Sequence, residues 1–296
     1  MIAPPCKDLK VIRYAEGYGY SAREWKKAFS AVNWSGGGAQ PLKHGRKGSV
    51  WRAKLRVSGR ELDCVLKVEP LGTVWKRLRA LCLQTKAHRQ WRGAERLARV
   101  GVSAAMPLAY LRSPGAEVLV LPWVEGPTLL EFLRGLAGRD PKGQVGREIG
   151  AERAVCASVA EMLGAMWWNH AHNGDGKPSN LVLDPSAEHG IRVLDTVAVR
   201  RQKFGLLGTL REVEHDLASL YIEPAGCGLT PRRSLCWRLL SAIGETDAFP
   251  ARVRHGRDPR RLLRVIFRDT ALRIRMHGDP TPQDDPLARP AQPGRS

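Results

Sequence analysis

Three polar residues near the middle of the chain have side-chain types and a spacing that suit phosphoryl transfer. Asp175 is followed by Asn180 in the segment 172–184, which reads HNGDGKPSNLVLD, and another acid, Asp195, lies 20 residues after Asp175. In transfer from Mg-ATP, one carboxylate orients the attacking hydroxyl, while an amide and a second carboxylate hold the metal ion that bridges the phosphates. Two hairpin strands could present all three side chains to one cleft, so the pattern favours this chemistry.

Upstream of these residues, alternating apolar positions predict a pair of strands. Residues 50–57 alternate with a period of two, 58–60 form the turn, and 62–68 read as the return strand. This pattern places Val65 and Lys67 on the face opposite the most apolar one. A lysine beside a valine suits a roof over ATP that contacts phosphate. Alone it would more often be a solvated sheet lysine, but its position before the acidic loop favours the nucleotide interpretation.

A glycine-containing turn precedes the first of these strands. Gly45 and Gly48 flank it and Val50 follows, so backbone N–H groups could approach a phosphate with no Cβ in the way. The segment lacks one glycine of a full G-x-G-x-x-G and fails the G-x4-G-K-[ST] pattern, so alone it would be an ordinary hairpin turn. Its place ahead of Lys67 and Asp175 favours a nucleotide lid.

The remaining segments predict two parts of different character. A basic amphipathic helix is expected over 76–99, with strands at 105–111 and 117–124. Helices follow over 128–136 and 152–168, beyond a hinge between residues 121 and 127, and five prolines after residue 278 indicate a disordered tail. We therefore expect an α+β chain with three parts: a sheet-containing N-terminal part at 1–124, a mainly helical part at 125–278 and the tail at 279–296.

Composition narrows the class of partner and the compartment. The 48 Lys and Arg against 29 Asp and Glu leave a formal charge of +19, which predicts an acidic partner such as a phosphorylated glycan, an anionic membrane surface or nucleic acid. The six cysteines form no C-x-x-C pair, which favours a reduced, cytosolic chain. The sequence has no signal-peptide core and no apolar run near the roughly 20 residues of a membrane span. We expect a cytoplasmic protein with peripheral contact at the inner membrane.

Taken in order, these motifs resemble the lipopolysaccharide kinase (Kdo/WaaP) family within the protein-kinase-like fold. The resemblance covers about residues 42–243. Its parts are Lys67 in VLKV, the helix segment 86–92 (KAHRQWR), the loop 175–180 (DGKPSN), Asp195, and the segment 216–220 (DLASL). It implies a two-lobed fold with an antiparallel-sheet N-lobe and a mainly helical C-lobe.

The resemblance also implies roles for individual residues. Lys67 would contact the α- and β-phosphates, Asp175 would accept or orient the acceptor hydroxyl, and Asn180 and Asp195 would hold Mg²⁺. Asp216 resembles a buried acid that hydrogen-bonds the catalytic loop, and a surface helix acid is an equally good interpretation. The implied nucleotide-binding residues, including the adenine-side hinge, are Gly45, Gly48, Val50, Val65, Lys67, Leu121 and Trp123.

The chain departs from the family pattern at several positions. Gln90 stands where the family's long helix carries an acid, so we expect no ion pair from that position to Lys67. Glu95 is an imperfect substitute because it lies about 140° further round the helix. Asn173 stands where a histidine is usual, and Thr196 follows the second acid where phenylalanine is usual.

Two histidines allow a different interpretation of the loop. His170 and His172 could place two imidazoles on one strand as metal ligands. No third ligand lies near them in the sequence, so we interpret them as side chains that orient the loop through hydrogen bonds.

These observations lead to one functional hypothesis and several alternatives. We expect an ATP- and Mg²⁺-dependent kinase acting on a sugar hydroxyl, heptose or Kdo, of the lipopolysaccharide inner core, whose phosphates and carboxylates would attract a basic enzyme. The same fold could instead phosphorylate a protein Ser/Thr hydroxyl or a small molecule, although an aminoglycoside-like cation fits the charge poorly. A pseudokinase binding module is the alternative suggested by Gln90, Asn173 and Thr196. A nucleic-acid binder rests on charge alone, and no feature of the sequence predicts the oligomeric state.

Overall fold

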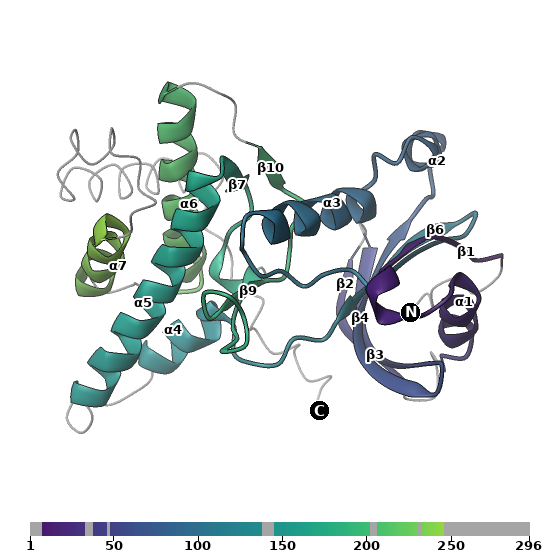
Figure 1. Cartoon of the computed structure of the whole chain (residues 1–296), viewed down its shortest axis with the longest axis horizontal. Helices are drawn as coiled ribbons and strands as arrows, with labels where there is room; N and C mark the ends of the chain where they lie inside the picture. The colour runs from purple at the N-terminus through teal and green to yellow at the C-terminus, as the bar shows by residue number, and fades with distance from the viewer. Residues whose placement is uncertain are drawn as a thin grey trace, which may run out of the picture. The chain divides into compact units, whose positions relative to one another are not determined.

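The computed structural model describes residues 8–32, 38–45, 48–137, 145–201, 206–229 and 233–245. The chain divides into two compact units, the first formed by residues 1–95 and 105–124 and the second by residues 96–104 and 125–296. The fold is α+β, with a sheet in the first unit and mainly helices in the second (Figure 1). The predicted tail at 279–296 lies outside the described residues.

The first unit contains a six-stranded antiparallel sheet with the strand order β1-β5-β6-β4-β3-β2. The register places Lys67 of β4 opposite Val50 of β3 and Leu119 of β6. The strands are β1 (Lys10–Tyr14), β2 (Ala39–Gly45), β3 (Gly48–Val57), β4 (Arg60–Pro70), β5 (Ala109–Arg112) and β6 (Ala116–Pro122).

Each face of this sheet has its own apolar core. The alternating apolar residues of β3 and β4, among them Trp51 and Leu66, pack against Trp25 of helix α1 (Ala22–Ser30). A short 3-10 helix, η1 (Glu16–Tyr18), precedes α1 in the chain. The opposite face carries Val65 and packs against helix α3 (Lys86–Arg99). The predicted alternation over 50–57 and 62–68 is therefore confirmed.

Two predicted elements differ from the structure. The helix expected over 76–99 is two helices, α2 (Val74–Leu81) and α3, because Leu83 between them has φ of +52°. Thr85 then begins α3, its hydroxyl accepting a hydrogen bond from the backbone N–H of His88 at 3.3 Å. The strand expected from residue 105 begins only at Ala109.

The second unit combines helices with two short two-stranded antiparallel sheets, β7–β10 and β8–β9 (Figure 1). Helix α4 begins after Thr128, which forms a reciprocal capping pair with Glu131. Gly126 just before it has φ of +119°, and a Cβ there would lie 2.4 Å from the Leu183 carbonyl oxygen, so this turn requires glycine. Both helices predicted at 128–136 and 152–168 are present. The elements are α4 (Leu129–Ala137), α5 (Val145–Trp168), β7 (Ala171–Asn173), η2 (Pro178–Asn180), β8 (Leu181–Leu183), β9 (Ile191–Val193), β10 (Val199–Arg201), α6 (Leu206–Gly226) and α7 (Arg233–Glu245).

None of the described helices combines the length and the apolar character needed to cross a bilayer.

Candidate functional site

In the first unit, the predicted nucleotide-binding residues of three neighbouring strands share one face of the sheet. Val50 and Lys67 are cross-strand partners, as are Val65 and Leu121. Directly opposed residues project to the same side of a sheet, and positions two apart along β4 do so as well. The structure therefore brings these four side chains onto the face that packs against α3.

Lys67 is held from that face by a residue of α3. Its Nζ atom donates a hydrogen bond to Gln90 Oε1 at 2.9 Å, and Gln90 is only 1% exposed. At this contact the lysine therefore meets a neutral amide. Glu95 is engaged elsewhere: its carboxylate pairs with Arg13 and accepts from Trp91 Nε1 at 3.0 Å.

The two glycines and Trp123 of the predicted nucleotide site also have structural roles in the first unit. Gly48 has φ of +151°, and a Cβ there would lie 2.5 Å from the Val68 carbonyl oxygen, so the close approach of β3 to β4 requires glycine. Gly45 pairs with Gly48 at the end of the β2–β3 hairpin. The Trp123 backbone N–H donates to the Asp63 carbonyl at 2.9 Å, and the Arg52 guanidinium lies 3.8 Å from the centre of its indole ring.

In the second unit, the residues predicted to carry the chemistry form one hydrogen-bonded cluster. Asn180 Nδ2 donates to the Asp175 carboxylate at 3.2 Å and to the Asp175 carbonyl at 2.9 Å. The Leu194 N–H donates to the Asn180 carbonyl at 2.8 Å, which aligns Asp195 beside the loop. Asn173 joins the two acids, because its Oδ1 accepts from the Asp175 N–H at 3.2 Å while its Nδ2 donates to the Asp195 carbonyl at 3.4 Å. Asn173 therefore ties the loop together through its side-chain amide.

The electrostatic surroundings of Asp175 suit a proton acceptor. Burial raises the pKa of the Asp175 carboxyl above its ordinary value, and the charge of Asp195 adds to this effect. Lys177, whose Nζ lies 3.7 Å from Asp175 Oδ1, and the hydrogen bond from Asn180 lower that pKa in part. A higher pKa makes the carboxylate a stronger base, and Lys177 supplies positive charge at the same place.

Asn180 and Asp195 have donor atoms that fit Mg²⁺. Because Asn180 Nδ2 donates to Asp175, its Oδ1 is the atom suited to a cation. The Val197 N–H donates to Asp195 Oδ1 at 3.1 Å and so fixes the orientation of this carboxylate. Amide and carboxylate oxygens are the hard ligands that Mg²⁺ prefers in proteins.

No protein-family model matches the chain, and no curated protein matches it significantly.

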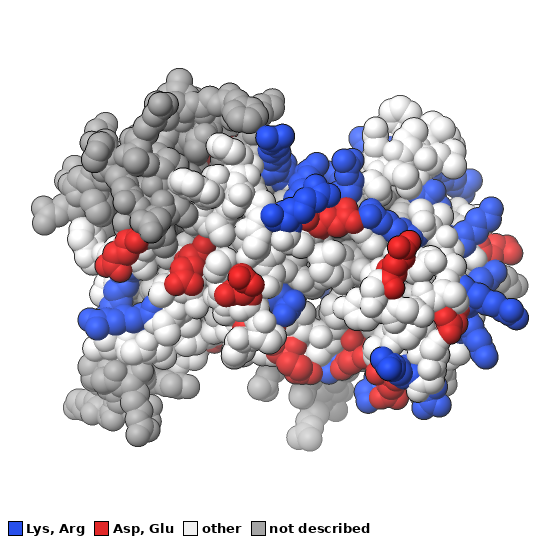
Figure 2. All heavy atoms as spheres, viewed as in Figure 1, with Lys and Arg blue, Asp and Glu red and all other residues white. Residues whose placement is uncertain are grey.

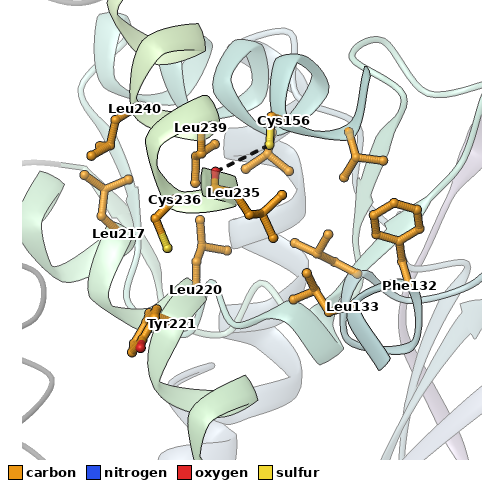
Figure 3. A pocket seen from close by; sticks show the side chains of 13 residues that line it. Phe132, Leu133, Cys156, Leu217, Leu220, Tyr221, Leu235, Cys236, Leu239 and Leu240 are labelled. Carbon is orange, nitrogen blue, oxygen red and sulfur yellow. Dashed lines mark hydrogen bonds between the residues drawn. The ribbon is translucent and has the colours of Figure 1, made fainter. Parts of the chain in front are cut away.

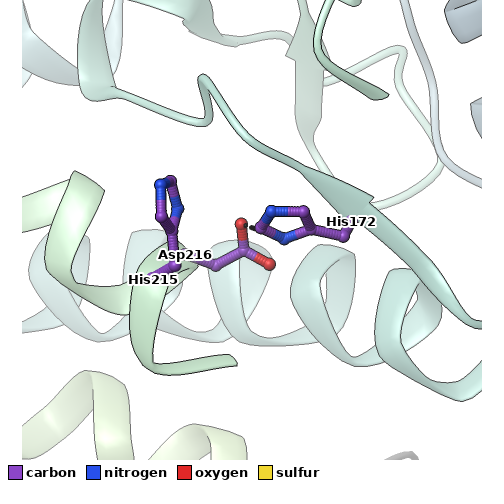
Figure 4. Close-up of side chains that lie close together, drawn as sticks. All are labelled: His172, His215 and Asp216. Carbon is purple, nitrogen blue, oxygen red and sulfur yellow. Dashed lines mark ion pairs between the residues drawn. The ribbon is translucent and has the colours of Figure 1, made fainter. Parts of the chain in front are cut away.

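Beneath the loop, a buried carboxylate links three elements of the second unit. Asp216 of α6, 2% exposed, accepts a hydrogen bond from Trp167 Nε1 of α5 at 3.0 Å, and its Oδ1 lies 3.0 Å from His172 Nδ1 of β7. Figure 4 shows this carboxylate directed at the His172 ring, with the His215 ring beside it. The interpretation of Asp216 as a surface acid is therefore wrong. Asp216 contacts the side chain of His172, which lies in β7 directly before the loop. This contact therefore anchors the strand that leads into the loop.

Within the described part of the chain, His172, His215 and Asp216 also lie close enough together to bind a metal ion. Ligand atoms of His172, His215 and Asp216 all lie within 4.8 Å of one another. His170, which the sequence paired with His172 as a metal ligand, is not part of this group, and α6 supplies two of its three members. The Trp167 indole already donates to Asp216 Oδ2, whereas Asp216 Oδ1 and His172 Nδ1 are buried and have no hydrogen-bond partner among the described residues.

The sequence did not predict the contact between Ser179 and Glu223 or the contact between Lys177 and Asp175. Ser179 donates from its N–H and its hydroxyl to the Glu223 carboxylate of α6, at 2.7 and 2.6 Å. Lys177 lies within the predicted loop, and its spacing of two from Asp175 could have drawn attention to it. Glu223 and Trp167 carry no such signal, because their partners are distant in the sequence.

The second unit also contains an apolar cavity among α4, α5, α6 and α7 (Figure 3). Its volume of about 80 Å³ is well below the several hundred Å³ typical of a small-molecule site. Burial raises the pKa of Cys156 to about 11 and also raises that of Cys236, so both cysteines in its wall remain thiols near neutral pH. The cavity therefore offers apolar packing and no catalytic group. It is lined by Leu129, Phe132, Leu133, Val155, Cys156, Val159, Leu217, Leu220, Tyr221, Leu235, Cys236, Leu239 and Leu240.

Proposed function

We propose that the protein is an ATP- and Mg²⁺-dependent kinase that transfers the γ-phosphate to a sugar hydroxyl of the lipopolysaccharide inner core, heptose or Kdo. The proposal includes a protein-kinase-like arrangement in which the two units are the two lobes. The observation that carries it is the hydrogen-bonded cluster of Asp175, Asn180, Asn173 and Asp195, which combines a carboxylate of raised pKa with oxygen ligands for a hard cation.

Each residue of this cluster has a defined task in the transfer. Asp175 orients the acceptor hydroxyl and takes up its proton, while Lys177 offsets negative charge that develops on the transferred group. Asn180 and Asp195 would hold Mg²⁺, which would supply positive charge to offset that of the nucleotide phosphates. Asn173 keeps the metal-binding strand and the base in register.

In the first unit, Lys67 would contact the α- and β-phosphates from the sheet face that carries Val50, Val65 and Leu121. The hydrogen bond from Lys67 Nζ to Gln90 would orient the ammonium group for this contact. The formal charge of +19 supports an acceptor rich in phosphate and carboxylate over a cationic one.

A nucleotide-binding pseudokinase is the second candidate. Gln90 favours it, because a neutral amide lies 2.9 Å from Lys67 where the family carries an acid. The two candidates share a nucleotide site and differ in turnover, so a test must measure both properties.

The decisive experiment is mass spectrometry of lipid A–core oligosaccharide after incubation with Mg-ATP and the purified protein. We expect wild type to add the mass of one phosphate. Asp175→Ala should bind Mg-ATP without turnover, whereas Asp195→Ala should lose both, each turnover falling by roughly a thousandfold or more. Nucleotide binding is measured separately by the shift of the thermal unfolding midpoint.

Glu161→Ala provides the matched control, since Glu161 is an acid of the second unit whose side chain is 57% exposed. It should behave as wild type in both assays. Nucleotide binding with no phosphate added to the oligosaccharide would favour another acceptor or the pseudokinase. Normal turnover by Asp175→Ala would contradict the role assigned to that residue.

A further inference from the structure

Helix α2 of the first unit presents its apolar side to solvent. Val74, Trp75 and Leu81 are 73%, 70% and 73% exposed, and Leu78 and Leu83 are exposed as well. Four of these residues lie within one helix of eight residues. In Figure 2 the part of the surface that carries α2 is uncharged, with Lys and Arg side chains next to it. Contiguous apolar surface of this kind usually marks a contact site.

The helix is fixed in this orientation by its polar residues. Lys76 Nζ donates to the Pro70 carbonyl at 2.9 Å, and Arg77 Nε donates to the Leu71 carbonyl at 3.2 Å. Ala80, on the same side of the helix, is 2% exposed. The usual amphipathic arrangement is therefore reversed. The side chains of Lys76 and Arg77 hold the helix to the end of β4, and the apolar residues point outward.

A basic pocket adjoins this helix in the same unit. Its volume is about 290 Å³, and four cationic side chains, those of Lys76, Arg79, Lys86 and Arg89, contribute to its walls.

Two acids, Glu69 and Glu117, also line the pocket. Glu69 pairs with Lys86 at 3.5 Å and lies 4.0 Å from Lys76, and Glu117 pairs with Arg112 at 3.0 Å. Among the described residues, the side chains of Arg79 and Arg89 therefore meet no acid. The excess of positive charge fits a phosphate group.

We propose that α2 docks on the surface of an anionic phospholipid bilayer. Trp75 and its apolar neighbours enter the boundary between headgroups and acyl chains, and the basic pocket receives a lipid phosphate. Exposed tryptophan beside cationic side chains is typical of helices that lie in the membrane interface. A convex apolar stripe suits a fluid surface that moulds itself to the helix, whereas a protein partner would have to supply a matching groove.

This inference stands independently of phosphoryl transfer, because it uses residues of α2 and the adjoining pocket that have no assigned role in the chemistry. It assigns a membrane contact to the first unit of a chain whose charge already predicts anionic partners. Each Lys or Arg near an anionic surface contributes about 1 kcal/mol to binding, which corresponds to about fivefold in the partition coefficient.

The test is flotation of the full chain with lipid vesicles made either of phosphatidylcholine alone or of equal parts phosphatidylcholine and phosphatidylglycerol. We expect wild type to float with the anionic vesicles only. Trp75→Ser combined with Leu81→Ser should reduce the partition coefficient by about tenfold or more, and Arg79→Ala by about fivefold in low salt.

Matched controls separate this surface from general basicity. Trp168→Ser removes a tryptophan that is 63% exposed in the second unit, and Arg56→Ala removes an exposed cation on β3; both should float as wild type. Failure of wild type to bind anionic vesicles would overturn the proposal, as would an equal loss in Trp168→Ser.

A second copy of the chain is the competing occupant of the apolar stripe. Sedimentation velocity without lipid decides this point. A wild-type dimer that dissociates in the Trp75→Ser, Leu81→Ser variant would assign the stripe to self-association and overturn the membrane proposal, whereas a monomer in both proteins supports it.

Discussion

The two units hold their key cations and acids in different ways. In the first unit, the charged Lys67 meets the neutral amide of Gln90 at 2.9 Å. In the second unit, the Asp216 carboxylate meets His172 and Trp167, and the Asp175 carboxylate meets Lys177 and Asn180. The second unit therefore places charged or strongly polar groups next to its acids. In the first unit, the contact between Lys67 and Gln90 has the shape of a lysine–glutamate pair, but Gln90 carries no negative charge.

Under the proposed function, this difference affects nucleotide binding in the first unit and phosphoryl transfer in the second. Two opposite unit charges 4 Å apart attract by about 4 kcal/mol at an effective dielectric constant near 20, before desolvation is subtracted. An amide gives less, so under the proposed function Gln90 would weaken the placement of Lys67 and with it nucleotide binding. Under the same proposal, the loop of the second unit keeps the contacts to Asp175 that proton transfer would need.

The largest effect is expected from removing the buried carboxylate. Asp216→Ala leaves Trp167 Nε1 buried without this acceptor and removes the carboxylate that lies 3.0 Å from His172 Nδ1. Loss of one partner from such a buried network costs about 3 kcal/mol of unfolding free energy. Urea denaturation followed by tryptophan fluorescence measures this loss.

The control for that variant is again Glu161→Ala, whose exposed side chain lies 3.7 Å from His189. It should change the unfolding free energy by less than about 0.5 kcal/mol. Equal stability of the two variants would show that the shared carboxylate does not support β7 and the loop.

An intermediate effect is expected at Gln90, where the comparison can be changed directly. Gln90→Leu removes the acceptor 2.9 Å from Lys67 Nζ and should weaken Mg-ATP binding by about tenfold, equivalent to about 1.4 kcal/mol. Gln90→Glu keeps the shape, restores the charge and should bind at least as tightly as wild type. Isothermal titration calorimetry compares the three proteins. If Gln90→Leu binds Mg-ATP as wild type does, then the amide does not position Lys67 for the phosphates.

The contrast between the units also marks the limits of what the sequence could predict. The period-two alternation around Trp51 and Leu66 identified the sheet and its core face, because that pattern depends only on local geometry. The break between α2 and α3 escaped prediction, because apolar and basic residues continue through Leu83 with near-helical spacing. The strand β1 and helix α1 were not predicted at all.

For the candidate site, local spacing was informative and long-range contacts were not. Asp175 and Asn180 cluster because they share one loop, and Asp195 follows the strand that pairs with the end of that loop. The Glu223 contact to Ser179 spans 44 residues, and no short pattern encodes it. The contact between Gln90 and Lys67 also spans elements that are distant in the sequence, and only the family resemblance, which places Gln90 where an acid would face Lys67, indicated it.

The smallest effect is expected from Lys177, which adjusts the charge around the proposed base. Burial raises the pKa of Asp175, and the Lys177 ammonium group holds it below the value it would otherwise reach. Under the proposed function Asp175 must be ionised to accept a proton, so turnover falls as the pH drops through this pKa. Lys177→Met removes the cation, raises the pKa further and should move the acid limb of the kcat/KM profile to higher pH.

The matched control is Lys54→Met, because Lys54 lies on β3 in the first unit, where it pairs with Glu61 at 2.8 Å. Its acid limb should coincide with that of wild type. A shift to lower pH in Lys177→Met would have the wrong sign for a carboxylate base losing a nearby positive charge. Such a result would assign the acid limb to a different group and leave Asp175 as a residue that orients the hydroxyl without taking its proton.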